Sequence, residues 1–105
     1  MSDYKVFYSS LSQRDLDEIF DYIAVELANP ASASEIVTNI LDAADSLASF
    51  PAIGGIVRNV PFLTCEYRFL PVHNYIVFYR IMDTHIFVDR ILYKKRDYAR
   101  LLGLQ

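Results

Sequence analysis

The residues best suited to chemistry in this sequence lie together near its end. In the stretch RILYKKRDYARLLG, residues 90–103, five cations stand beside two tyrosines. Arginine side chains form paired hydrogen bonds with phosphate or carboxylate oxygens, and Arg68, in an earlier apolar run, adds a further cation. A tyrosine phenol has an ordinary pKa near about 10, so it accepts a proton at neutral pH only beside strong cationic neighbours. The pattern therefore predicts a site for an anionic ligand or partner.

The formal charge of the chain is divided unevenly. The net charge is −3 over 105 residues, but residues 1–60 hold three cations against nine acids, and residues 61–105 hold seven cations against four acids. Such asymmetry favours a positively charged surface for an acidic partner, either nucleic acid or protein. The alternative interpretation is that the helices happen to carry the acids and the strands the bases.

Cysteine and histidine are too few for a disulfide framework or a zinc centre. Cys65 is the single cysteine, and the two histidines, His73 and His85, are not at zinc-ligand spacing. We expect structural roles for all three residues, no metal and no cofactor. The first residues lack the basic and apolar regions of a signal peptide, and no apolar run is long enough to span a bilayer. The expectation is a cytoplasmic protein without membrane contact.

The first half of the chain predicts a strand followed by a helix. Residues 4–9, YKVFYS, are rich in aromatic and β-branched side chains, as strands are. A helix is predicted to begin at Ser10, which forms a capping-box pattern with Gln13 three residues later. Apolar residues then recur at helical spacing and are predicted to form one buried face: Leu16, Ile19, Phe20, Ile23 and Leu27.

A second helix and three strands complete the predicted fold. Asn29 and Pro30 are suited to cap and start a helix, whose apolar period runs to Leu47. From Cys65 the runs CEYRFLPV, NYIVFYRIM and HIFVDRILY have the composition of strands joined by short turns. We therefore predict a single α+β domain, residues 1–105, in the order β-α-α-β-β-β with a short C-terminal helix ended by Gly103. An antiparallel sheet with the helical hairpin on one face and a free opposite face is expected.

In this order the elements and their local patterns resemble the RelE/ParE superfamily of toxins from bacterial type II toxin–antitoxin systems, also described as plasmid stabilisation proteins. The resemblance covers nearly the whole chain. It rests on DLDEIFDYIA in the first helix, FPAIGG after the hairpin, YRFLPVHNYIVFYRI across the central strands and VDRILYKKRDYARLL at the end. It implies a small cytoplasmic toxin that a cognate antitoxin neutralises by wrapping it with a helix or an extended segment.

The superfamily contains two kinds of toxin, and the resemblance implies one or the other. RelE-like and YoeB-like members are ribosome-dependent mRNA endonucleases (mRNA interferases), whereas ParE-like members inhibit DNA gyrase and cut no RNA. Metal-independent RNA cleavage needs a proton acceptor, a proton donor and cations beside the phosphate. If this chain is such an endoribonuclease, its candidate catalytic residues are Arg68, Arg90, Tyr93, Lys94 and Arg96.

Departures from the nuclease pattern favour the ParE-like branch. Leu70 stands where the nuclease pattern has a lysine, and Ile76 follows Tyr75 where that pattern has an arginine. Leu92-Tyr93 lacks the histidine of the YoeB-like ending. The isoelectric point near 5.2 is also unfavourable for entry into the polyanionic ribosome. The prediction is a gyrase inhibitor; the alternatives are a ribosome-dependent nuclease and an attenuated, non-toxic module that binds an antitoxin.

The C-terminal cations also predict where a partner binds. An acidic, amphipathic antitoxin segment is expected to meet arginine and lysine side chains on the free face of the sheet. The residues predicted to bind the antitoxin or the target are Arg68, Arg90, Lys94, Lys95, Arg96, Tyr98 and Arg100.

Overall fold

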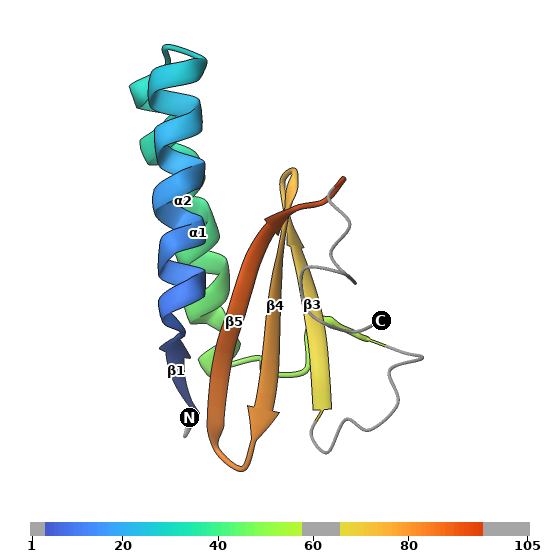
Figure 1. Ribbon diagram of the computed structural model, residues 1–105. Coiled ribbons are helices and arrows are strands. Elements are labelled where there is room, and N and C mark those ends of the chain that lie inside the picture. The colour runs from blue at the N-terminus through green and yellow to red at the C-terminus, as the bar shows by residue number, and fades with distance from the viewer. Residues whose placement is uncertain (1–3, 58–65, 96–105) are drawn as a thin grey trace.

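The helices and strands are described for residues 4–57 and 66–95 in a computed structural model (Figure 1). In chain order they are β1 (Lys5–Tyr8), α1 (Ser10–Asp21), the π-helix η1 (Tyr22–Glu26), α2 (Pro30–Asp45), the 3₁₀ helix η2 (Ser46–Ala48), β2 (Gly55–Ile56), β3 (Glu66–Val72), β4 (Tyr75–Met82) and β5 (His85–Tyr93). The predicted α+β class is confirmed. The predicted terminal helix, Gly103 and Cys65 lie outside the described residues.

The helical hairpin begins and turns at hydrogen-bonded caps. Ser9 is the N-cap of α1, because its Oγ accepts a hydrogen bond from the backbone N–H of Ser12 at 3.0 Å. The predicted start of the helix at Ser10 is confirmed, but the N-cap is Ser9 and not Ser10 of the predicted capping box. The predicted start of the second helix is confirmed: Asn29 Oδ1 accepts a backbone N–H at 3.2 Å, and Pro30 is the first residue of α2.

The five strands form one sheet in the order β1-β5-β4-β3-β2. β1 pairs in parallel with β5, and every other neighbouring pair is antiparallel. The expectation of a purely antiparallel sheet is therefore wrong, because the meander brings its last strand back beside the first strand in the same direction. β2 was not predicted, because a strand of two residues is too short to show an alternation of apolar and polar side chains. The turns at His73 and Asp83, each with a φ of 55°, join the last three strands where hairpins were predicted.

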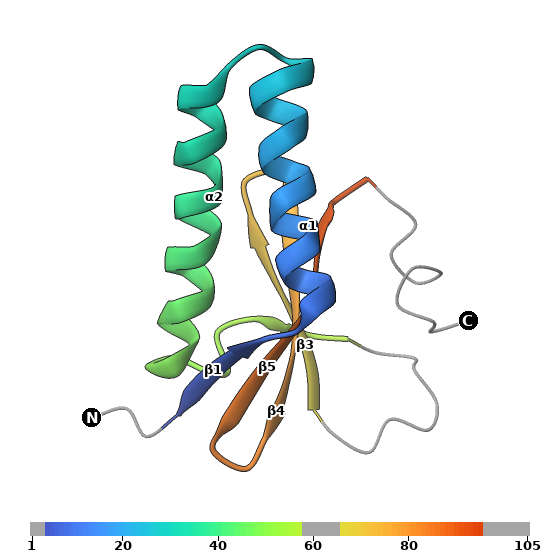
Figure 2. The ribbon, with the colours of Figure 1, turned by 60° about the vertical axis from the view of Figure 1, so that its left-hand side comes forward.

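The helical hairpin covers one face of the sheet (Figures 1 and 2). Ile40 and Leu47 from the helical layer are fully buried against Val77, Tyr79 and Ile86 of the strands. Because side chains alternate along a strand, a second, smaller cluster lies on the opposite face and consists of Tyr67, Phe78 and Leu92. The tip of the hairpin stands beyond the end of the sheet (Figure 1).

No helix among the described residues is both long enough and apolar enough to cross a membrane.

Candidate functional site

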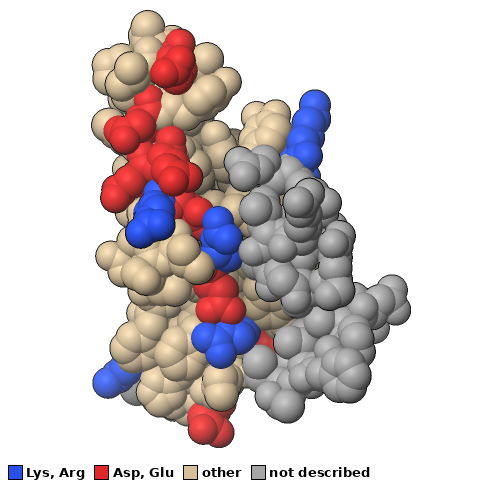
Figure 3. Space-filling view, viewed as in Figure 1, with Lys and Arg blue, Asp and Glu red and all other residues tan. Residues whose placement is uncertain are grey.

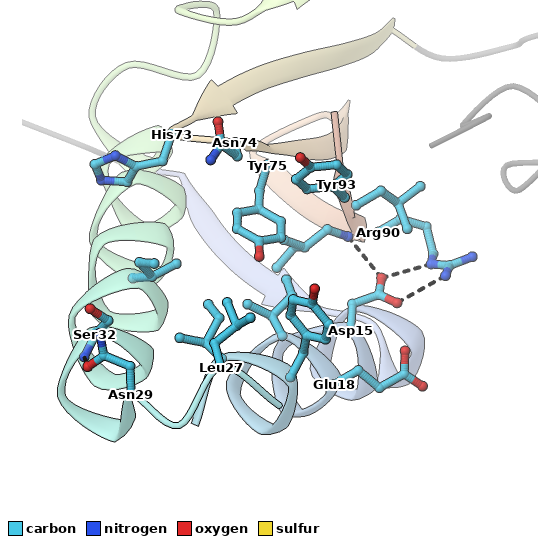
Figure 4. Close-up of a pocket in the computed structure, with 16 residues that line it drawn as sticks. Asp15, Glu18, Leu27, Asn29, Ser32, His73, Asn74, Tyr75, Arg90 and Tyr93 are labelled. Atoms are coloured by element: carbon cyan, nitrogen blue, oxygen red, sulfur yellow. Dashed lines mark hydrogen bonds and ion pairs between the residues drawn. The ribbon is translucent and has the colours of Figure 1, made fainter. Parts of the chain in front are cut away.

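A groove of about 830 Å³ lies between the outer part of the helical hairpin and the ends of β4 and β5 (Figure 4). At one end are Asp15 and Glu18 of α1 with Arg90 of β5, and at the other are Asn29 and His73 (Figure 4). Between these polar ends the lining is mainly apolar and consists of Ile19, Ile23, Leu27, Ile36, Ile91 and Leu92. Three tyrosines, Tyr22, Tyr75 and Tyr93, and the polar residues Ser32 and Asn74 also line it.

The acidic end of the groove is built on an ion pair between α1 and β5. Arg90 donates two hydrogen bonds to the Asp15 carboxylate, from Nε at 2.8 Å and from Nη2 at 3.0 Å. The same carboxylate accepts the backbone N–H of Ile91 at 2.9 Å. The Asp15 side chain is 7% exposed, and its hydrogen bonds raise the pKa of Arg90 although burial opposes the charge. Arg90 therefore joins a helix to the sheet, rather than presenting a guanidinium to a ligand as predicted.

Arg68 lies on the opposite face of the sheet from the one predicted. It pairs in register with Tyr79, whose side chain is part of the core beneath the helices, so Arg68 shares the helix-covered face. Its Nη1 donates to the carbonyl oxygens of Ala52 at 3.2 Å and Gly54 at 2.6 Å, and the guanidinium also pairs with Glu66. The placement of Arg68 on the free face was wrong, because its charge is used to hold the loop before β2.

The other predicted site residues lie beside the groove or beyond the described part of the chain. Tyr93 is 38% exposed on the groove wall. Lys94 and Lys95 follow it, and both are exposed. The remaining three, Arg96, Tyr98 and Arg100, lie outside the described residues. The structure thus places Arg68 on β3, two strands away from Arg90 on β5, and places Lys94 and Lys95 just after β5.

The surroundings of Tyr75 in the groove favour a protonated phenol. Tyr75 and Tyr93 are adjacent in the pairing of β4 with β5, and their rings meet edge to face at a centroid distance of 5.8 Å. Burial raises the pKa of Tyr75, and the nearby phenols of Tyr93 and Tyr22 raise it further. A general base needs the opposite shift, so Tyr75 is suited to packing and hydrogen bonding rather than to proton abstraction.

The family of this chain is identified by comparison with models of known protein families. The profile of the family described as "ParE toxin of type II toxin-antitoxin system, parDE" matches residues 6–98. The chain belongs to this ParE toxin family. No protein in a search of curated sequences matches it.

Two solved structures are similar to this ParE-family chain. The chromosomal ParDE toxin–antitoxin system from P. aeruginosa gives a TM-score of 0.71 at 22% identity, covering 86% of this chain and 95% of that one. The RelBE2 toxin–antitoxin complex from Mycobacterium tuberculosis gives a TM-score of 0.61 at 19% identity, covering 86% of this chain and 96% of that one. At these identities the likeness shows a common fold.

The sequence did not reveal the groove of this ParE-family chain. Leu27 and Phe20 were predicted to be buried with the rest of their helical face, but they are 56% and 37% exposed. Leu27 follows η1 at the tip of the hairpin, which extends past the sheet, whereas Phe20 lies on a side of α1 that does not line the groove (Figure 1).

Proposed function

We propose that this ParE-family chain is a cytoplasmic toxin that inhibits DNA gyrase and is neutralised, in a hetero-oligomer, by an antitoxin segment seated in the groove. The groove carries this proposal: Tyr22 and Leu27 are 55% and 56% exposed beside its apolar floor. Exposed apolar surface of this kind is typical of grooves that bind an amphipathic helix. The two similar structures are a toxin–antitoxin system and a toxin–antitoxin complex, which supports the same partner here.

The two arginines of the predicted site that the structure describes favour gyrase inhibition over RNA cleavage. Arg68 is bonded to loop carbonyls and Arg90 to a buried carboxylate, so neither is presented to a scissile phosphate. Among the described residues of the predicted site, the cations left to stabilise charge on the phosphate are Lys94 and Lys95 after β5. A gyrase inhibitor requires only a docking surface. The ribosome-dependent endonuclease remains the alternative function.

Expression of the chain in cells that lack its antitoxin tests the target. Labelled thymidine incorporation is expected to stop within the first minutes while labelled amino acid incorporation continues, because an inhibited gyrase blocks replication before translation. An early stop in amino acid incorporation would instead favour the ribosome. Normal incorporation of both labels would favour the non-toxic alternative.

Two substitutions at the end of β5 serve as the control for that experiment. Tyr93→Phe removes one phenol proton and Lys94→Ala one exposed cation, and neither side chain is needed for the core. A gyrase inhibitor should retain its toxicity in both variants. A nuclease that uses these residues would lose about 100-fold or more of its cleavage rate.

Removing the exposed apolar edge of the groove should weaken antitoxin binding. The double variant Tyr22→Ala, Leu27→Ala is expected to raise the dissociation constant of the purified antitoxin by about 10-fold to 100-fold in a calorimetric titration, because aromatic and large apolar anchors dominate such interfaces. Phe50→Ala is the matched control, since Phe50 is 63% exposed and does not line the groove. Equal affinities for the two variants would contradict the assignment of the groove.

A further inference from the structure

A second exposed surface runs along the side of α1 and η1 that does not line the groove. Asp17, Phe20, Asp21 and Val25 are spaced at i, i+3, i+4 and i+8, so they share one face of the helix and form the outer stripe. Phe20 is 37% exposed and Val25 is 71% exposed. None of the four lines the groove, so a segment bound there would leave the outer stripe open.

The outer stripe is acidic as well as apolar. Asp17 and Asp21 are exposed, and neither forms an ion pair within residues 4–57 and 66–95. Figure 3 shows acidic side chains gathered over α1 toward the tip of the hairpin. Exposed Glu26 adds to this charge, and Arg14 is the one cation of α1 and η1. An apolar strip flanked by carboxylates is complementary to a basic surface with an apolar centre.

The same combination does not occur on the other helix of the hairpin. Glu35 and Asp42 are exposed acids of α2, but the described residues of α2 include no exposed large apolar side chain. A solvated acidic helix needs no exposed valine or phenylalanine, and these side chains remain in water unless a partner covers them. Exposed apolar and acidic side chains therefore occur together on α1 and η1 but not on α2.

We propose that the outer stripe docks the toxin's target through a positively charged protein surface, as an interface separate from the antitoxin groove. This inference rests on the proposed toxin function. The carboxylates steer the encounter with a basic surface, and Phe20 and Val25 supply the apolar contact that holds the complex. The groove and the outer stripe lie on different sides of one hairpin, so a variant of the outer stripe can lose toxicity and keep its antitoxin.

The test is the double variant Asp17→Lys, Asp21→Lys, expressed in cells that lack the antitoxin. Its matched control is Glu35→Lys, Asp42→Lys, which makes the same change of net charge on α2. We expect the outer-stripe variant to lose about 10-fold or more of its growth inhibition, while the control keeps wild-type inhibition. The dissociation constant of the purified antitoxin should change by less than about twofold in both. Circular dichroism melting checks that both variants are folded.

Other outcomes of this experiment would overturn the inference. Undiminished inhibition by the outer-stripe variant would exclude the stripe as a target surface, and equal losses in both variants would reduce the effect to net charge. Loss of antitoxin binding by the outer-stripe variant alone would make the stripe an antitoxin contact. If the outer-stripe variant does not fold, Val25→Ser gives the same comparison without a charge change. A wild-type chain that leaves growth unaffected would instead refute the proposed toxin function, and the inference with it.

Discussion

Replacing Asp15 with alanine is expected to lower the free energy of unfolding by about 3 to 5 kcal/mol, because it leaves a partly buried guanidinium without its carboxylate. Arg90 is only 19% exposed in its side chain, so water replaces the lost hydrogen bonds poorly. The backbone N–H of Ile91 also loses its acceptor. Thermal unfolding followed by circular dichroism should show a fall in Tm of about 12 °C or more.

Two other substitutions on the same helix separate the ion pair from general effects on α1. Asp15→Asn keeps an oxygen that can accept the N–H of Ile91 but removes the charge, so its cost should lie between wild type and Asp15→Ala. Asp17→Ala removes an exposed carboxylate with no ion pair among the described residues and should change stability by less than about 0.5 kcal/mol. Equal destabilisation by Asp15→Ala and Asp17→Ala would contradict the structural role of the ion pair.

Gly54→Ala should destabilise the protein by about 3 kcal/mol, at the upper end of what overpacking costs. A Cβ at this position would lie 2.6 Å from the carbonyl oxygen of Phe69 and 2.6 Å from the Tyr79 hydroxyl. The first of these is backbone in β3 and cannot turn aside. The second donates to the carbonyl of Pro51 at 2.8 Å and accepts the N–H of Gly54 at 3.1 Å, so moving it breaks two hydrogen bonds. Urea unfolding measures the loss.

Gly55→Ala provides the comparison for Gly54. The nearest atoms to a Cβ at Gly55 belong to the ring of Phe69, at 2.6 and 2.7 Å, and that ring is part of a partly buried side chain that can rotate. We therefore expect a smaller loss of stability than for Gly54→Ala. If both variants lost the same stability, the close backbone contact of Gly54 would not be the reason for its glycine.

The sequence predicted those parts of the fold that have local causes. The cap at Asn29 with Pro30 places the turn of the hairpin, and the change of apolar period marks the three long strands. The parallel pairing of β1 with β5 had no such cause, because it joins segments 80 residues apart. The sequence of a four-residue strand does not indicate at which edge of a sheet, formed much later in the chain, that strand will pair.

Two of the cations from which the candidate site was predicted, Arg68 and Arg90, have internal partners in the fold. In the sequence, Arg90 and Asp15 look like two independent surface ions, but the fold brings them together across 75 residues. Arg68 likewise finds loop carbonyls that only the path of residues 50–55 provides. These two arginines, predicted to bind a partner, thus connect parts of the fold, whereas the groove is lined largely by apolar residues that periodicity predicts to be buried.

The parallel pairing of β1 with β5 also fixes when this protein can exist in folded form. Lys5 pairs with His85, so β1, the first strand to be synthesised, cannot pair until β5 has been synthesised. A ribosome adds about 5 to 20 residues per second, which makes the wait on the order of 5 to 15 s. Until then α1 lacks both its ion pair and the strand beneath it. The groove proposed to bind the antitoxin is therefore completed only after residues 90–93 have been synthesised, although its helical wall comes from the first third of the chain.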